Sequence, residues 1–167
     1  SQLRQQVSQV LQDSFLFGEP LYSNISYDDP ERNLELIWDA AESASLRGSI
    51  DDFPMKMHTI VGERGVTLSG GQKQRATLAR GLIRNAPVLI LDDCFSSVDT
   101  KTEEHILSRL TRLRAGKTTI LVSHRISTLR HSDRIVVLEA GEIVEIGSHE
   151  ALLELNGAYA QLERAQT

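Results

Sequence analysis

Residues 68–75 have the sequence LSGGQKQR, and residues 88–93 have the sequence VLILDD. The second stretch is a short apolar run that ends in two acids, which is typical of a strand covered on both faces in a parallel sheet. Between the two stretches, residues 70–84 carry apolar side chains at helical spacing, and Asn85-Ala86-Pro87 ends the predicted helix. The alternation of helix and strand patterns along the chain predicts an α/β fold.

The same patterns recur along the chain. Residues 100–113 place Ile106, Leu110 and Leu113 on one helical face, and this helix would join two parallel strands as a βαβ unit. Glu139-Ala140-Gly141-Glu142 predicts a hairpin turn. The other predicted elements are strands at 7–11, 118–122, 135–138 and 143–146 and helices at 33–44, 148–154 and 158–164, with 118–122 and 135–138 expected to lie covered in the parallel sheet.

Composition sets the limits on function. The chain has 167 residues, of which 40% are hydrophobic, so it can bury a core of its own. Its net charge of −5 and the lack of a basic stripe argue against nucleic acid as a partner. The first residues do not form a signal peptide, and the missing initiator Met suggests that the chain begins within a longer protein. Cys94 is the single cysteine, which excludes an internal disulfide, and its expected role is packing.

Polar residues follow three of the predicted strands. They are Gln12, the pair Asp92 and Asp93, and His124. In an open α/β sheet, ligands bind beyond the carboxyl ends of the strands, so we expect these side chains to lie at one edge. Asp92 would stand in the outer shell of Mg²⁺, which keeps several waters and accepts few carboxylates. The other four histidines lack the spacing of metal ligands, so no further metal site is predicted.

The start of the 70–84 helix predicts an anion site. Ser69 can cap the helix, while Gly70 and Gly71 leave backbone N–H groups uncovered for close approach by an anion. The helix dipole places about half a positive charge at that end. Asp99 would likewise cap the helix that begins at residue 100.

These motifs together resemble the C-terminal part of the ATP-binding domain of an ABC transporter, whose signature is Leu-Ser-Gly-Gly-Gln and whose Walker B strand ends like residues 88–92. The resemblance implies a P-loop NTPase-like parallel sheet (residues 1–19 and 87–167) with an inserted helical subdomain (20–86). It also implies ATP and Mg²⁺ as cofactors. The residues Ser69, Gly70, Gly71 and Gln72 would bind the γ-phosphate of ATP held by a second nucleotide-binding domain, and Asp99 would lie in the D-loop between the two sites.

The resemblance further assigns roles to the strand-end residues. Gln12 would belong to the Q-loop, which meets the metal and the attacking water, and His124 would be the switch histidine that contacts the terminal phosphate. Residues 12–17, Asn24-Ile25 and residues 59–65 resemble exporters rather than importers, DNA-repair ATPases or ribosome-associated ATPases. In exporters, the Q-loop and Gly62-Glu63-Arg64 lie near helices of a transmembrane domain in the same chain, at the cytoplasmic face of the inner membrane. The family commonly has Thr where Pro20 stands, so the local turn is expected to differ.

Asp93 departs from the family pattern. Glu usually follows the Walker B aspartate as the general base, and Asp is one methylene shorter. The combination resembles the degenerate-site subunit of bacterial heterodimeric exporters. Two interpretations follow, which are an ATP-hydrolysing exporter subunit with a weakened site of its own, and a regulatory subunit that lends its signature to a catalytic partner.

The phosphate-cradling motif Gly-x-x-x-x-Gly-Lys-Ser/Thr has no match in the 167 residues. Gly116-Lys117-Thr118 is not an example, because Thr111 stands where the first glycine is required. We therefore expect residues 1–167 alone to bind ATP poorly and to show no ATPase activity.

Overall fold

The computed structural model describes residues 5–62 and 65–166. The chain divides into two compact units, Ser1–Val122 and Ser123–Thr167, which are described here separately. In the described ranges, no helix combines the length and the apolar character that a membrane span requires.

The first unit contains a three-stranded parallel sheet. The strands are β1 (Val7–Val10), β2 (Val88–Asp92) and β3 (Thr118–Val122), in the order β1-β2-β3. Helix α6 (Thr100–Leu113) connects β2 to β3, so the predicted βαβ unit is confirmed. Because the strands run parallel, residues that follow their carboxyl ends emerge at the same edge of the sheet.

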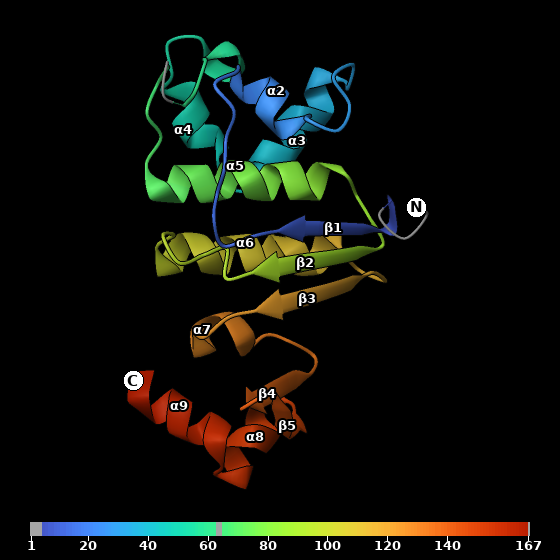
Figure 1. The fold of residues 1–167 in the computed structure, drawn as a ribbon, viewed down its shortest axis with the longest axis vertical. Coiled ribbons are helices and arrows are strands. Elements are labelled where there is room, and N and C mark those ends of the chain that lie inside the picture. Colours follow the sequence, from blue (N-terminus) through green and yellow to red (C-terminus); the bar gives the residue numbers. More distant parts are fainter. Residues whose placement is uncertain (1–4, 63–64, 167) are drawn as a thin grey trace. The chain divides into compact units, whose positions relative to one another are not determined.

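A helical segment separates β1 from β2 in the sequence. It contains α2 (Leu21–Ile25), α3 (Leu34–Ser43), α4 (Arg47–Asp51), the short 3₁₀ helix η1 (Lys56–His58) and α5 (Gly70–Ile83). Figure 1 shows α5 running alongside β1, with α2, α3 and α4 on its other side. Asn85 has a positive φ of 50° and turns the chain from α5 into β2, where the sequence predicts the helix to end.

One apolar core joins the sheet to the helices of the first unit. Leu89 and Leu91 of β2, Ala76 and Ala79 of α5 and Ile106 of α6 are fully buried in it. Gly81 is needed where α5 packs against β1, because a Cβ there would lie 2.4 Å from Val10 Cγ2. The helical segment is therefore packed directly onto the first strand.

The prediction that the strand at 118–122 lies covered is wrong. Ile120 and Val122 of β3 are 46% and 49% exposed. The apolar run at 118–122 does form a strand, but only β2 pairs with it among the described residues. An apolar run predicts that a strand forms. Whether that strand is buried depends on which other elements pack against its faces.

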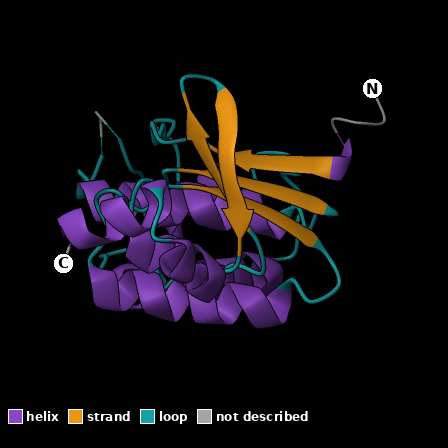
Figure 2. Cartoon of the chain, turned by 90° about the horizontal axis from the view of Figure 1, so that it is seen from below, coloured by secondary structure: helices purple, strands orange, loops and turns teal. Residues whose placement is uncertain are grey.

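The second unit contains α7 (Ile126–Leu129), β4 (Ile135–Glu139), β5 (Glu142–Gly147), α8 (His149–Leu155) and α9 (Ala158–Gln166). The hairpin prediction is confirmed, since β4 and β5 pair antiparallel through a turn with positive φ at Ala140 and Gly141 (Figure 2). The prediction that residues 135–138 belong to the parallel sheet is wrong, because β4 pairs with β5 in a separate two-stranded sheet. Because a short hairpin connects β4 to β5, β5 is available as the pairing partner of β4.

Side-chain caps begin the last two helices. Ser148 accepts a hydrogen bond from Ala151 N–H at the start of α8. Both carboxylate oxygens of Glu145 accept hydrogen bonds at the start of α9, from Ala158 N–H at 2.6 Å and Tyr159 N–H at 3.0 Å. Gly157 leaves the room that this carboxylate occupies.

Candidate functional site

The start of α5 is a capping box. Ser69 Oγ accepts a hydrogen bond from Gln72 N–H at 3.2 Å, and Gln72 Oε1 accepts one from Ser69 N–H at 2.9 Å. The predicted cap at Ser69 is confirmed, and the backbone N–H that it binds is that of Gln72. Ser69 and Gly70 are exposed, so this helix start, with its partial positive charge, faces solvent.

The glycines of this helix start make room for the chain's own Ser97. A Cβ on Gly71 would lie 2.7 Å from the Ser97 carbonyl oxygen, and a Cβ on Gly70 would lie 3.2 Å from Ser97 Cβ and Oγ. Real Cβ atoms do not come within 3.0 Å of a backbone atom. The loop of residues 96–99 therefore occupies part of the space beside these glycines that the sequence analysis assigns to an anion.

The loop that follows β1 comes to the same place. A cavity of about 240 Å³ brings Gln12 together with Gly70 of α5 and Ser97 of the 96–99 loop. The remaining lining residues are Asp13, Ser14, Lys73, Gln74 and Ser96. Gln12 is exposed, so its amide is accessible to a ligand at this position. The structure therefore brings two of the sequence-predicted residues, Gln12 and Gly70, to one cavity.

The two carboxylates stand at the end of β2. Asp92 pairs in register with Val122, and Asp93 N–H donates to Val122 O at 2.8 Å. Both residues are half-buried. Asp93 has a left-handed φ of 43°, a conformation that Asp and Asn tolerate better than longer side chains do.

The donor set fits Mg²⁺ held through a nucleotide better than it fits a metal held by protein alone. In residues 5–62 and 65–166, no group of three or more His, Cys, Asp or Glu side chains could hold an ion. Mg²⁺ in nucleotide sites typically takes one or two carboxylates, with waters and phosphate oxygens as the other ligands. Asp92, at the carboxyl end of β2, is a carboxylate of the kind that such a site uses.

His124 belongs to the second unit, so its position beside Gln12 and Asp92 stays a prediction. Within that unit, the side-chain amide of Gln166 holds its backbone. Gln166 Nε2 donates to His124 O at 2.6 Å, and Gln166 Oε1 accepts from Ile126 N–H at 2.9 Å.

Asp99 is the cap of α6. Its Oδ1 accepts a hydrogen bond from Thr102 N–H at 3.0 Å, which is the main reason that the pKa of the Asp99 carboxyl is lowered. The predicted cap is confirmed, while the role of Asp99 between two nucleotide sites stays a prediction. Cys94 is buried, as expected of a packing residue, and burial raises its pKa to about 12.

Two residues important for the site were missed by the sequence analysis. Gln74 is only 5% exposed, and its amide bonds Ser96 Oγ and Ser97 N–H, both at 2.8 Å. Arg80 donates to Asn24 O at 2.7 Å and to Phe15 O at 2.9 Å, which fixes the loop after β1 on α5. The partners lie far away in the sequence, so no local spacing could have indicated these contacts.

Asn24 completes this attachment of the loop after β1. Its Oδ1 accepts from Phe17 N–H at 2.8 Å, and its Nδ2 donates to Phe17 O at 3.1 Å. The Phe17 ring stacks on Tyr27, with ring centroids 4.7 Å apart, and the Arg80 guanidinium lies over the same ring. Pro20 precedes α2 at its N-cap position, and its backbone needs no donor there.

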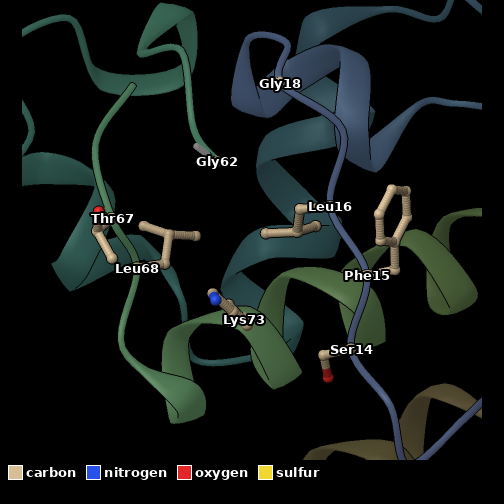
Figure 3. Close-up of a pocket in the computed structure, with 8 residues that line it drawn as sticks. All are labelled: Ser14, Phe15, Leu16, Gly18, Gly62, Thr67, Leu68 and Lys73. Carbon is tan, nitrogen blue, oxygen red and sulfur yellow. The ribbon is translucent and has the colours of Figure 1, made fainter. Parts of the chain in front are cut away.

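A groove of about 630 Å³ lies between this loop and the segment that precedes α5. Figure 3 shows Leu16 and Leu68 pointing toward one another across it, with the Lys73 amine beside them and the Phe15 ring turned away. The other lining residues are Ser14, Gly18, Gly62 and Thr67. Gly62 of the predicted Gly62-Glu63-Arg64 segment lines the groove, while Glu63 and Arg64 lie outside the described residues.

Comparison with known proteins identifies relatives of this chain. Residues 1–96 match the ABC transporter family. Over 160 residues the chain is 46% identical to YgaD of Bacillus subtilis, described as a multidrug export ATP-binding/permease protein, and the match covers 96% of this chain and 28% of that protein. Over 165 residues it is 45% identical to an ATP-dependent lipid A-core flippase of Alkalilimnicola ehrlichii, covering 98% of this chain and 28% of the flippase.

A solved structure shares the fold. A bacterial Atm1-family ABC exporter with ATP bound superposes with a TM-score of 0.94 at 41% identity, over 99% of this chain and 29% of the exporter chain. The expected P-loop NTPase-like α/β fold is therefore confirmed. The chain spans between a quarter and a third of the length of these relatives.

Proposed function

The chain belongs to the ABC transporter family, and we propose that it forms part of an ATP-binding and ATP-hydrolysing subunit of a membrane exporter. ATP closes two nucleotide-binding domains against each other, and hydrolysis reopens them to drive efflux. The exposed, Ser69-capped glycine start of α5 carries this proposal, because its amides and dipole suit the phosphate of a nucleotide on a second domain.

The proposed partners follow from the two surfaces described above. The start of α5 would face a second nucleotide-binding domain, most simply in a heterodimer. The groove beside Leu16 and Leu68 would receive a helix from the transmembrane domain of the same full-length chain, at the cytoplasmic face of the inner membrane. Residues 20–86 would act as the helical subdomain, and residues 1–19 and 87–167 as the sheet core. No nucleic acid takes part.

In this proposal the residues of the sheet edge bind and orient. ATP with Mg²⁺ supplies the phosphoryl group and the charge that polarises it. Asp92 would lie in the metal's outer shell and accept a hydrogen bond from a metal-bound water, Gln12 would orient the attacking water, and His124 would donate a hydrogen bond to the terminal phosphate. Asp93 would accept the proton of the attacking water.

Asp93 makes its own site slow. A general base works only within hydrogen-bond reach, and the shorter carboxylate at a backbone φ of 43° reaches less far than Glu would. A displacement of ~1 Å can lower a rate by roughly 10²-fold. The site built on Asp92 and Asp93 is therefore proposed to hydrolyse ATP weakly, while its signature segment supports turnover at the partner's site.

The test is Asp93→Glu in the full-length heterodimer whose partner has lost its own catalytic carboxylate. Residual ATPase then comes from this chain's site and should rise by about ten- to hundredfold. Asp93→Gln is the matched control, because it has the same length and the same strain at positive φ but cannot accept the proton. An unchanged rate in Asp93→Glu would reject the weakened-site proposal.

The second candidate is a regulatory nucleotide-binding subunit that catalyses nothing itself. It is favoured if the same heterodimer, with wild-type Asp93 and a disabled partner site, has no turnover above background. Residues 1–167 by themselves are proposed to be inactive under either candidate, because they lack the phosphate-cradling motif. Robust ATPase activity of the purified piece would contradict this.

A further inference from the structure

Gln74 makes two hydrogen bonds from one buried amide to two consecutive residues of the 96–99 loop. Its Oε1 accepts from Ser97 N–H and its Nε2 donates to Ser96 Oγ, each at 2.8 Å. The side chain leaves α5 one turn after the Ser69 cap and is 5% exposed. Because both ends of the amide are used, the bonds fix the orientation of the loop as well as its distance from the helix.

A second contact holds the same loop to the same helix. The Ser97 carbonyl lies so close to Gly71 that a Cβ would approach it to 2.7 Å. The contact with Gly71 places the loop against the first turn of α5. The hydrogen bonds of Gln74 hold it to the second turn. These contacts involve different atoms of Ser97, its carbonyl and its N–H.

The loop is also tied to the carboxylates. Only Cys94 and Phe95 separate Asp93 from Ser96, and both are buried in the core, at 1% and 3% exposure. Asp93 N–H is in turn bonded to Val122 O on β3. A shift of Ser96 and Ser97 cannot be absorbed in a flexible linker before it reaches Asp93.

We propose that Gln74 is a positioning residue that locks the 96–99 loop to the start of α5. The helix start that faces a partner's nucleotide and the carboxylates of this chain's own site then move as one body. This inference rests on the proposed function for its consequence, whereas the lock itself is a property of the fold that can be measured without turnover.

The first experiment measures the lock by hydrogen exchange in the full-length protein. Gln74→Met keeps the length of the side chain and removes both hydrogen bonds, so the amide of Ser97 should exchange at least about tenfold faster in peptides covering residues 95–98. Ser96→Ala, at an exposed position, removes only the hydroxyl partner and should give a smaller increase. Gln161→Met, at an exposed position of α9, is the matched control and should leave this exchange unchanged.

The second experiment measures the consequence in the assembled exporter. Gln74→Met should lower kcat for ATP by about tenfold and change KM by less than twofold, because geometry in the closed state is lost while nucleotide capture is kept. A general loss of folding would instead lower the melting temperature and the amount of active protein, with kcat per active site unchanged.

The outcomes separate the two levels of the proposal. Unchanged exchange at Ser97 in Gln74→Met overturns the lock, whatever the ATPase does. Faster exchange with an unchanged kcat overturns the coupling of the two sites. Faster exchange in an assembly that has no ATPase even as wild type contradicts the proposed function and leaves the lock established.

Discussion

Gly71→Ala is expected to separate helix stability from activity. Gly71 is the second residue of α5, where Ala is intrinsically favoured over Gly by about 0.5–1 kcal/mol. The added Cβ, however, would lie 2.7 Å from the Ser97 carbonyl oxygen, a backbone atom that cannot rotate away. The local preference of the helix and the packing of the loop therefore oppose each other.

The size of the effect follows from the contact. Ordinary van der Waals contact begins at 3.4 Å, so the loop must retreat by about 0.7 Å. The bond from Ser97 N–H to Gln74 Oε1, now 2.8 Å, would then approach the limit of a hydrogen bond. If Asp93 acts as proposed, a displacement of this order in the adjacent 96–99 loop predicts a loss of kcat of about ten- to hundredfold.

Gly48→Ala is the matched control for stability. Gly48 is also the second residue of its helix, α4, and in the part of the chain that the structure describes, no atom outside its own helical turn and chain neighbours lies within 4 Å of the Cβ it would gain. It should stabilise the protein by about 0.5–1 kcal/mol in denaturant unfolding and leave ATPase activity unchanged. Both variants are measured in the full-length protein, by unfolding and by ATPase rate.

A second substitution tests whether the clash with Ser97 is the cause. The Cβ of Gly70→Ala meets only the side chain of Ser97, at 3.2 Å, so adding Ser97→Gly should restore its activity. Ser97→Gly cannot rescue Gly71→Ala, because the carbonyl remains. If Ser97→Gly rescues both variants equally, or if Gly71→Ala keeps full activity, the reasoning from these contacts is refuted.

Two further predictions concern stability. Arg80→Met should destabilise the protein by about 1–3 kcal/mol in denaturant unfolding and speed hydrogen exchange in residues 15–24, because bonds to Phe15 O and Asn24 O are lost; unchanged exchange there would contradict the role of Arg80. For Cys94, whose pKa is raised by burial from 9.0 to about 12, the unfolded chain loses its proton first as the pH rises. Stability should therefore fall between pH 9 and 12 by about 1.4 kcal/mol per pH unit, and the same titration of Cys94→Ala should lack this component.

Features set by neighbouring residues could be predicted from the sequence. The cap at Ser69, the cap at Asp99 and the hairpin turn at Ala140-Gly141 each depend on a few consecutive residues, and each is confirmed. The bounds of α6 also follow directly, because its cap and its amphipathic pattern are both local. The parallel pairing of β1, β2 and β3 is also confirmed.

Features set by partners that are distant in the sequence could not be predicted from it. The covering of Ile120 and Val122 depends on which elements reach β3, and their β-branched and apolar character says nothing of that. Gln74 and Arg80 look like ordinary helix residues, since their partners lie more than 20 positions away. The signature glycines were predicted to admit an anion, yet part of their space is required by Ser97, which only the folded chain shows.

Helix α5 connects these distant partners in a way that bears on coupling. Arg80 binds the loop after β1, which forms the groove, and Gln74 binds the 96–99 loop. The two residues are about 9 Å apart along the helix axis, at about 1.5 Å per residue. Between them the helix is buried on Ala76, Leu78 and Ala79, so it cannot bend without opening the core.

A helix partner pressed into the groove would therefore have two ways to displace the loop after β1. It could break the hydrogen bonds of Arg80, which costs about 1–3 kcal/mol for a partly buried charged donor, or it could move α5 as a rigid body. In the second case the start of α5 and the 96–99 loop move together, because Gln74 and the Gly71 contact hold them. Rigid-body motion keeps every one of these bonds, so α5 is the physical route of lowest free-energy cost between the groove and the helix start that is proposed to bind phosphate.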